Sequence, residues 1–109
     1  MKFRKITAII RPERLEAVEE CLIKLNIPGA SVTRVKGFGE YKNFYDPSWL
    51  GTHVRVEVFI SVMQADEVAQ AIMAAAHTGI VGDGIIAVLP VESVYHIRTQ
   101  VKCRNETCK

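Results

Sequence analysis

Residues 65–72, ADEVAQAI, repeat the pattern of residues 15–22, LEAVEECL, and each segment follows an apolar run typical of a β-strand. In the first copy Leu15, Val18 and Leu22 recur at helical spacing, with glutamates on the other faces. Both segments are therefore expected to be amphipathic helices, the second over residues 66–77. The other apolar runs predict strands over residues 4–10, 31–38, 53–60, 85–91 and 94–98.

This order of strand, helix, strand, strand, helix and strand is a doubled βαβ unit. It predicts the α+β class: a ferredoxin-like βαββαβ sandwich, in which an antiparallel sheet carries two helices on one face. Valine and isoleucine occur on both faces of the predicted strands, so the second sheet face should be covered as well. Another copy of the chain is the expected cover, which makes an oligomer the expected state.

The chain of 109 residues is the size of one domain, which we expect over residues 1–99, with a mobile loop at 40–52 and a flexible tail at 100–109. A net charge of +2, with no basic run that carries interleaved aromatics, argues against nucleic-acid binding. No apolar stretch has the length of a membrane span, and the first residues do not resemble a cleavable signal. The expected location is the cytoplasm, without insertion into a membrane.

Three glycines and an aspartate precede a strand-like run in HTGIVGDGII, residues 77–86. Two interpretations are open. A cluster of glycines can be a simple turn between a helix and a strand, and this is the commoner case for such a loop alone. Alternatively, the backbone N–H groups of a glycine-rich turn can form an anion-binding concavity that suits phosphate.

Three ordered motifs resemble the PII signal-transduction family: KITAIIRPERLEAVEECL at residues 5–22, VKGFG at 35–39 and TGIVGDGIIAVLPVESVYHIRT at 78–99. The resemblance covers residues 5–99 apart from the mid-chain loop, and three motifs at compatible spacing outweigh the simple-turn interpretation. It implies a compact homotrimer of ferredoxin-like subunits with three intersubunit nucleotide clefts. It also implies a non-enzymatic sensor that signals to a protein partner through a long, mobile loop.

The resemblance carries the family's nucleotide site onto this sequence residue by residue. The wall around the base and ribose falls on Ile9, Gly29, Ala30, Ser31, Gly37, Glu57 and Phe59. The phosphate loop falls on Gly82, Asp83 and Gly84, and the nucleotide-binding set also includes Phe38, Gly39 and Thr78. His96 and Arg98 match the strand from which a neighbouring subunit supplies two arginines.

The sequence also departs from the family's pattern at cationic positions. Ile85 stands where the family's phosphate loop continues with a lysine, and His96 replaces one of the two arginines. Glu40 and Tyr41 replace an arginine and a glutamine that reach the terminal phosphate and its metal. Each lost cation removes a charge-assisted hydrogen bond to phosphate, so ADP or AMP is expected to bind better than ATP. The loss of that glutamine, together with His53 in place of a lysine, argues against 2-oxoglutarate as a second ligand.

These departures resemble a PII-like branch with a shortened loop, whose members accompany bicarbonate transport or carboxysomes. Bicarbonate is therefore a candidate second ligand, and no cofactor is expected to be tightly bound. A small anion is expected where Lys36, His53, Arg55 and the amides of residues 37–39 converge; the alternative is that these are ordinary strand and loop-edge residues. The protein target is unidentified, with a bicarbonate transporter or a carboxysome component as candidates.

Two other functions remain open at this stage. One is a conventional nitrogen-regulatory PII protein that binds MgATP and 2-oxoglutarate, and the other is a structural trimer with a vestigial cleft.

Cys103 and Cys108 enclose four residues of the tail and are a candidate redox pair, with two free thiols as the alternative in a reducing cytosol. The three histidines are widely separated and match no metal-binding spacing, so no metal site is expected. No nucleophile stands near a base in a recognisable motif, so no catalysis is expected.

Overall fold

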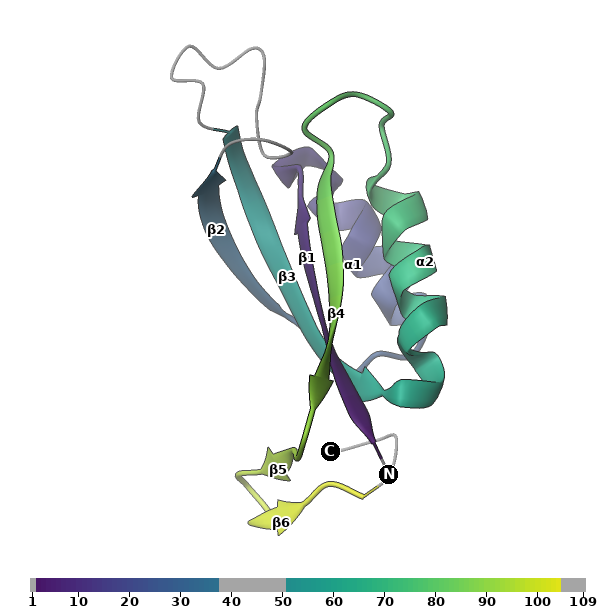
Figure 1. The fold of residues 1–109 in the computed structure, drawn as a ribbon, viewed down its shortest axis with the longest axis vertical. Helices are drawn as coiled ribbons and strands as arrows, with labels where there is room; N and C mark the ends of the chain where they lie inside the picture. The colour runs from purple at the N-terminus through teal and green to yellow at the C-terminus, as the bar shows by residue number, and fades with distance from the viewer. Residues whose placement is uncertain (1, 38–50, 105–109) are drawn as a thin grey trace.

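The computed structural model of the protein describes residues 2–37 and 51–104 (Figure 1). Its strands are β1 (Phe3–Ile10), β2 (Ser31–Gly37), β3 (Gly51–Ser61), β4 (Gly84–Val91), β5 (Tyr95–His96) and β6 (Val101–Lys102). Its helices are α1 (Leu15–Lys24) and α2 (Ala65–Ala76), and a short 3-10 turn precedes each of them, at Pro12–Arg14 and Val62–Gln64. Among the described residues no helix is both long enough and apolar enough to span a membrane.

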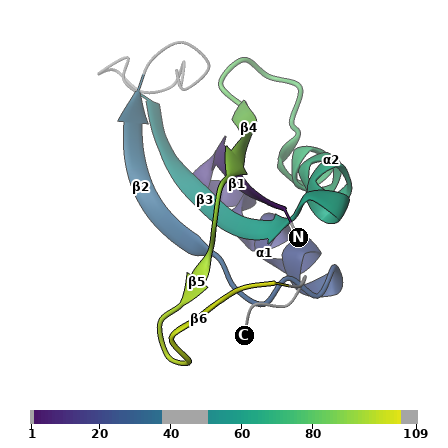
Figure 2. The ribbon, with the colours of Figure 1, turned by 60° about the horizontal axis from the view of Figure 1, so that its bottom comes forward.

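The main sheet has four antiparallel strands in the order β2-β3-β1-β4. Its register is continuous, so that Ile6 of β1 lies opposite Val58 of β3 and Val88 of β4. Both helices cover the same face of the sheet, as the two views in Figures 1 and 2 show. The expected α+β, ferredoxin-like βαββαβ fold is confirmed.

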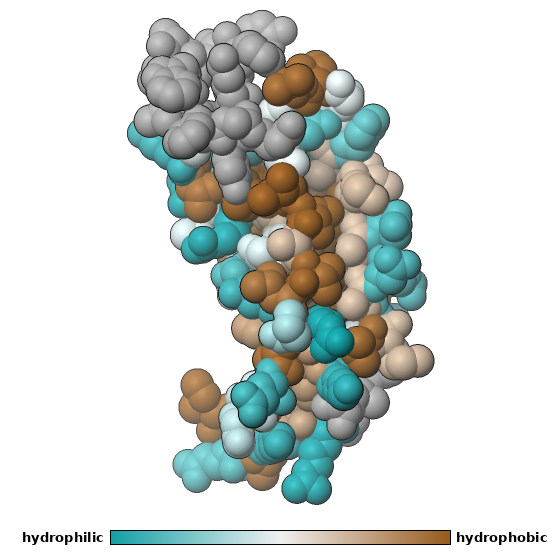
Figure 3. All heavy atoms as spheres, viewed as in Figure 1, coloured by the Kyte–Doolittle hydropathy of each residue, from teal (hydrophilic) through white to brown (hydrophobic). Residues whose placement is uncertain are grey.

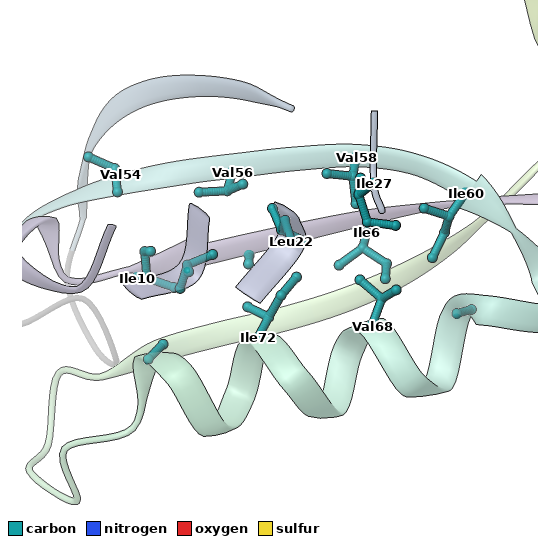
Figure 4. Packing of buried hydrophobic residues seen from close by; sticks show 14 residues of the cluster. Ile6, Ile10, Leu22, Ile27, Val54, Val56, Val58, Ile60, Val68 and Ile72 are labelled. Atoms are coloured by element: carbon teal, nitrogen blue, oxygen red, sulfur yellow. The ribbon is translucent and has the colours of Figure 1, made fainter. Parts of the chain in front are cut away.

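The core lies between the sheet and the two helices (Figure 4). Because side chains alternate along a strand, every second residue points toward the helices. These are Ile6, Ala8 and Ile10 on β1 and Val54, Val56, Val58 and Ile60 on β3, which pack against Val18, Leu22, Val68 and Ile72 of the helices. Burying each of the larger side chains contributes ~1.5–3 kcal/mol, so this layer holds the helices on the sheet.

The opposite face of the sheet carries the alternate residues, and part of it is apolar. Phe59 of β3 is 55% exposed and Ile85 and Leu89 of β4 are 45% and 40% exposed. Figure 3 shows apolar side chains gathered along β4 in the same view as Figure 1. Lys5 and Glu57 form an ion pair on this face, with 2.7 Å between Nζ and Oε2. These exposed apolar residues are consistent with the prediction that a second copy of the chain covers this face.

The C-terminal strand differs from the prediction. A strand over residues 94–98 is wrong, because the strand spans only Tyr95–His96, and it pairs with Val101–Lys102 in a separate two-stranded hairpin. Gln100, with φ of 58°, makes the tight turn between the two strands. The domain boundary expected after residue 99 falls inside this hairpin, so residues 101–102 are strand and not tail.

Several other element ends shift by a residue or two, and two of these shifts matter for the loops. β3 begins at Gly51, so residues 51–52 are strand and not part of the expected loop, whose remaining residues lie outside the described chain. The second helix ends at Ala76 and not at residue 77, because His77 is extended, with φ of −66° and ψ of 132°.

Candidate functional site

The glycine loop, residues 77–83, links the end of α2 to the start of β4 (Figure 1). Three glycines in or next to it have positive φ: 87° at Gly79 and 107° at both Gly82 and Gly84. At Gly84 a Cβ would lie 1.7 Å from the carbonyl oxygen of Ile9, which no side chain can satisfy. The glycine at position 84 is thus required by the close approach of β4 to β1, independently of any ligand.

The Asp83 carboxylate organises the loop from within. It accepts hydrogen bonds from the backbone N–H groups of Thr78 and Gly79, each at 2.9 Å, and from the Thr78 hydroxyl. Burial alone would raise the pKa of the Asp83 carboxyl, but the hydrogen bonds from Thr78, Gly79 and Arg11 outweigh burial and hold that pKa well below its usual range. Asp83 is therefore ionised and turned into its own loop, so its contacts are those of a structural anion.

Arg11, directly after β1, forms hydrogen bonds to the same loop. Its Nε donates to Asp83 Oδ1 at 3.0 Å, and its Nη2 donates to the carbonyl oxygens of Val81 at 3.0 Å and Ile80 at 3.3 Å. The Arg11 side chain is only 12% exposed. Sequence reasoning missed this residue because Arg11 and Asp83 are far apart in the chain, and only the pairing of β1 with β4 brings them together.

His53, near the start of β3, is the third residue that contacts the loop through its side chain. It is buried, and its Nε2 lies 2.6 Å from the carbonyl oxygen of Gly82. A ring N–H at Nε2 donates to that carbonyl, which fixes the tautomer. His53 is therefore a buried loop anchor, and this contact does not support its predicted role as a ligand of a small anion.

The predicted anion site is not formed by these strands. Val35 pairs with His53 and Thr33 with Arg55, so those side chains share one face of the sheet. Lys36, one residue along β2, points to the opposite face. Arg55 instead faces Glu57, with 3.9 Å between Nε and Oε1. Lys36, His53 and Arg55 do not converge, because a one-residue offset along a strand reverses the side chain.

A cavity of about 180 Å³ lies beside the glycine loop, between the end of α2 and the ends of β1 and β4. Its lining residues are Ile9, Ile10, Met73, Ala76, His77, Asp83, Gly84, Ile85 and Ile86. Three predicted nucleotide residues, Ile9, Asp83 and Gly84, meet at this cavity. Val81 and Gly82 of the same loop do not line the cavity, and their N–H groups donate to no acceptor within the described chain. The loop therefore contains backbone donors without an acceptor and borders a largely apolar hollow at His77 and Asp83.

The other predicted nucleotide residues fall into two groups. Ser31 lies opposite Glu57 in the register, and Phe59 follows two residues later on the same face of β3. Gly29 and Ala30 precede Ser31 and are exposed, and Gly37 ends β2. Phe38 and Gly39 lie outside the described residues.

His96 and Arg98 lie on the β5–β6 hairpin, at the end of the sheet away from the glycine loop (Figure 1). His96 Nδ1 is 3.1 Å from Thr99 Oγ1, and Arg98 is exposed. A single chain therefore does not bring the glycine loop and these two side chains together.

Cys103 follows β6; it is buried and disulfide-bonded, and its N–H donates to the carbonyl oxygen of Val94 at 2.8 Å. Cys108 lies outside the described residues, so the proposed pair stays a prediction. The remaining cysteine, Cys21, is a free thiol whose pKa is raised by burial. Within the described chain no group of three or more His, Cys, Asp or Glu side chains is placed to hold a metal ion.

Comparison with known proteins identifies the family of this chain. The family model described as nitrogen regulatory protein P-II matches residues 3–101, which is nearly the whole chain. The chain belongs to the P-II family. Proteins of this family are regulatory signal transducers; they form homotrimers and bind nucleotides and protein targets.

Individual P-II proteins are similar to this chain over most of their length. The nitrogen regulatory protein P-II of Azospirillum brasilense is 40% identical over 107 residues, which cover 91% of this chain and 95% of that protein. Nitrogen regulatory protein GlnK of Escherichia coli is 40% identical over 102 residues, covering 86% and 90%. The crystal structure of Arabidopsis thaliana PII bound to citrate has 38% sequence identity and a TM-score of 0.81, and the match covers 94% of this chain and 89% of that one.

Proposed function

We propose that this protein is a P-II-like sensor that binds ADP or AMP in clefts between the subunits of a homotrimer and signals to a protein partner in the cytoplasm. The observation that carries the proposal is the glycine loop. It is held in one conformation by Arg11, His53 and Asp83, and it borders a cavity at His77 and Asp83. The N–H groups of Val81 and Gly82 in this loop have no acceptor within the described chain. Such a fixed set of donors is suited to a phosphate group. Because the chain belongs to the P-II family, an adenine nucleotide is the ligand that we propose.

The separation of the glycine loop from the β5–β6 hairpin supports an intersubunit cleft. Arg98 lies on the hairpin, too far along the sheet to face the loop of its own chain (Figure 1). In a ring of three copies the hairpin of one chain can approach the loop of the next. Exposed apolar residues on the hairpin, among them Ile97 at 91% and Tyr95 at 66%, favour a neighbouring copy as their cover.

The charge of the loop supports a preference for few phosphates. Asp83 contributes one negative charge and Arg11 one positive charge, and the two are paired at 3.0 Å, so the loop has no net charge of its own. Ile85, directly after Gly84, adds no cation. The phosphate-facing cation then comes from Arg98 of a neighbour, which suits one or two phosphates better than three.

Calorimetric titration of the purified trimer with AMP, ADP and ATP tests the proposal. We expect ADP or AMP to bind more tightly than ATP, and magnesium to change the ADP affinity little. A protein that binds no adenylate below millimolar concentration would contradict the proposal and favour a structural trimer.

A second candidate is a conventional nitrogen-regulatory role, which the names of the similar curated proteins favour. It predicts ATP binding that depends on magnesium and 2-oxoglutarate. The buried bond of His53 to Gly82 weighs against it, since a histidine used in this way is not available to an oxo acid. Titrating ATP with and without 2-oxoglutarate separates the two candidates.

The finer assignments to inorganic carbon rest on the resemblance alone. Bicarbonate remains a proposed second ligand, and it needs a site other than the predicted group of Lys36, His53 and Arg55. A bicarbonate transporter or a carboxysome component remains the proposed target. Co-purification of the trimer with its partner, with and without ADP and bicarbonate, tests both.

A further inference from the structure

Two arginines from the junction of β1 and α1 hold the whole connection between α2 and β4. Arg14 donates from Nε at 3.0 Å and from Nη2 at 2.6 Å to the carbonyl oxygen of Ala75, in the last turn of α2. Arg11 holds the loop itself, at the carbonyls of Ile80 and Val81 and at the Asp83 carboxylate. The two residues thus perform similar chemistry at two places, one on the helix end and one on the glycine loop.

Arg11 and His53 contact the glycine loop from the interior of the protein, and the outer surface of the loop stays exposed. Thr78 to Val81 are exposed, with Ile80 at 56% and Val81 at 54%, while Arg11 and His53 are largely or fully buried. A surface loop of this length would otherwise sample many conformations, and ordering it would reduce the affinity for any ligand. Here the chain itself does the ordering, through side chains that leave the exposed surface free.

The electrostatics follow the same logic. A carboxylate inside a loop that receives phosphate would repel the ligand unless its charge were neutralised. Arg11 supplies the opposite charge at 3.0 Å from Asp83, and its fork also fixes two neighbouring carbonyls. Arg11 therefore has two separable effects: it cancels the charge of Asp83 and it fixes the loop backbone.

We infer that Arg11 and His53 are positioning residues for the nucleotide site: they hold the glycine loop in its ligand-binding conformation before a ligand arrives. This inference rests on the proposed function for the identity of the ligand, but the holding of the loop is a property of the free protein. The two parts can therefore be measured separately.

The first readout is amide hydrogen exchange of the free protein, followed by NMR at Thr78 and Gly79, whose N–H groups are bound by Asp83. In Arg11→Gln we expect exchange at both amides to be at least tenfold faster, since Asp83 is no longer held in place. Arg14→Gln is the matched control, because it removes a similar fork from the helix end and leaves the loop contacts intact. Equal exchange rates in the wild type and Arg11→Gln would overturn the inference.

The second readout is the dissociation constant for ADP. We expect Arg11→Gln to raise it about tenfold, with a more unfavourable binding entropy, while Arg14→Gln stays within twofold of the wild type. Arg11→Lys keeps the charge but not the fork, and we expect it to recover only part of the loss. Full recovery by lysine, or an equal loss in Arg14→Gln, would overturn the positioning role.

His53 is tested by a pair of variants. His53→Gln can still donate a side-chain N–H to the Gly82 carbonyl, whereas His53→Leu cannot. We expect the leucine variant to show faster exchange at the loop amides and weaker ADP binding, and the glutamine variant to lie close to the wild type. Equal defects in the two variants would overturn a role for the hydrogen bond.

Failure of the ligand proposal looks different. Fast exchange in Arg11→Gln, together with a wild type that does not bind ADP, would overturn the proposed nucleotide function and still support the holding of the loop.

Discussion

The glycine loop and the β5–β6 hairpin lie at opposite ends of the sheet, and they are held in different ways. Arg11 directly after β1, His53 of β3 and Asp83 of the loop itself fix the glycine loop within one chain. The hairpin has two residue pairs, a backbone hydrogen bond of 2.8 Å from Gln100 to His96 and a disulfide-bonded Cys103, while Ile97 at its turn is 91% exposed. The loop is complete in a single subunit, whereas the hairpin leaves apolar and cationic side chains for another molecule.

The largest expected effect concerns the start of β4. Gly84→Ala places a methyl group against the Ile9 carbonyl and a side chain at positive φ. Overpacking costs ~1–3 kcal/mol and backbone strain another ~1–3 kcal/mol, so unfolding in urea should show a loss of about 2–6 kcal/mol. Gly29→Ala is the control, since nothing lies within 4 Å of a Cβ there. A loss below 0.5 kcal/mol, a limit of roughly the size seen at surface sites, would show that the loop end is not fixed as described.

The next largest effect concerns the Asp83 carboxylate, whose contribution to the free energy of unfolding depends on pH. Asp83→Asn should lower the free energy of unfolding by about 1.5–3 kcal/mol at pH 7, as for other hydrogen bonds to a charged group. The fold lowers the pKa of Asp83, so its stabilisation is fully present above the pKa of an unfolded aspartate, about 3.9, and is lost as the pH falls below it.

The difference in stability between Asp83→Asn and the wild type should therefore be constant between about pH 5 and pH 7 and shrink below about pH 4. Urea titrations at a series of pH values measure it. A difference that grows on acidification would show that Asp83 is not the stabilising anion of the loop.

At the hairpin the effect should fall on binding and not on folding. Arg98→Ala should weaken ADP binding by about 1.5–3 kcal/mol, because it removes a charged hydrogen bond to phosphate. Its free energy of unfolding should stay within about 0.5 kcal/mol of the wild type, since Arg98 is exposed. Lys24→Ala, which removes an exposed cation at the end of α1, serves as the control in calorimetry. Unchanged ADP affinity in an Arg98→Ala trimer would remove Arg98 from the site.

The smallest effect concerns the residue after the loop. Ile85→Lys places a cation beside Gly84, at a residue that is 45% exposed. Exposed charge pairs are worth up to ~1 kcal/mol, so the ratio of ATP to ADP affinity should rise about fivefold. Ile23→Lys, on the exposed side of α1, controls for the added charge. A constant ratio would contradict our account of the preference for few phosphates.

The fold was predictable because its signals are local. Helical spacing around Val18 and Leu22 and alternation along residues 53–60 each depend on a few neighbouring residues. The strand expected over residues 94–98 was wrong because an apolar run does not show which strand it pairs with. Its partner, Val101–Lys102, lies in a polar stretch without a strand pattern.

The site was only partly predictable from the sequence. The glycines at 82 and 84 indicated an unusual backbone conformation. The sequence did not show that the Ile9 carbonyl requires a glycine at position 84. Arg11 and His53 carried no local signal, because both reach the loop through sheet pairing across a long stretch of chain. The face on which Lys36 lies depends on the register with β3, and the sequence does not determine that register to a single residue.

The central claim is that the glycine loop of one subunit meets the hairpin of another, and mixed trimers test it most directly. Chains that carry Arg11→Gln and chains that carry Arg98→Ala are co-expressed with different tags, and trimers that contain both are purified and titrated with ADP. If loop and hairpin meet between neighbours, each mixed trimer contains one cleft with an intact loop and an intact hairpin. It should then bind one ADP with wild-type affinity, although neither parent trimer does. Mixed trimers that bind as weakly as their parents would contradict the account.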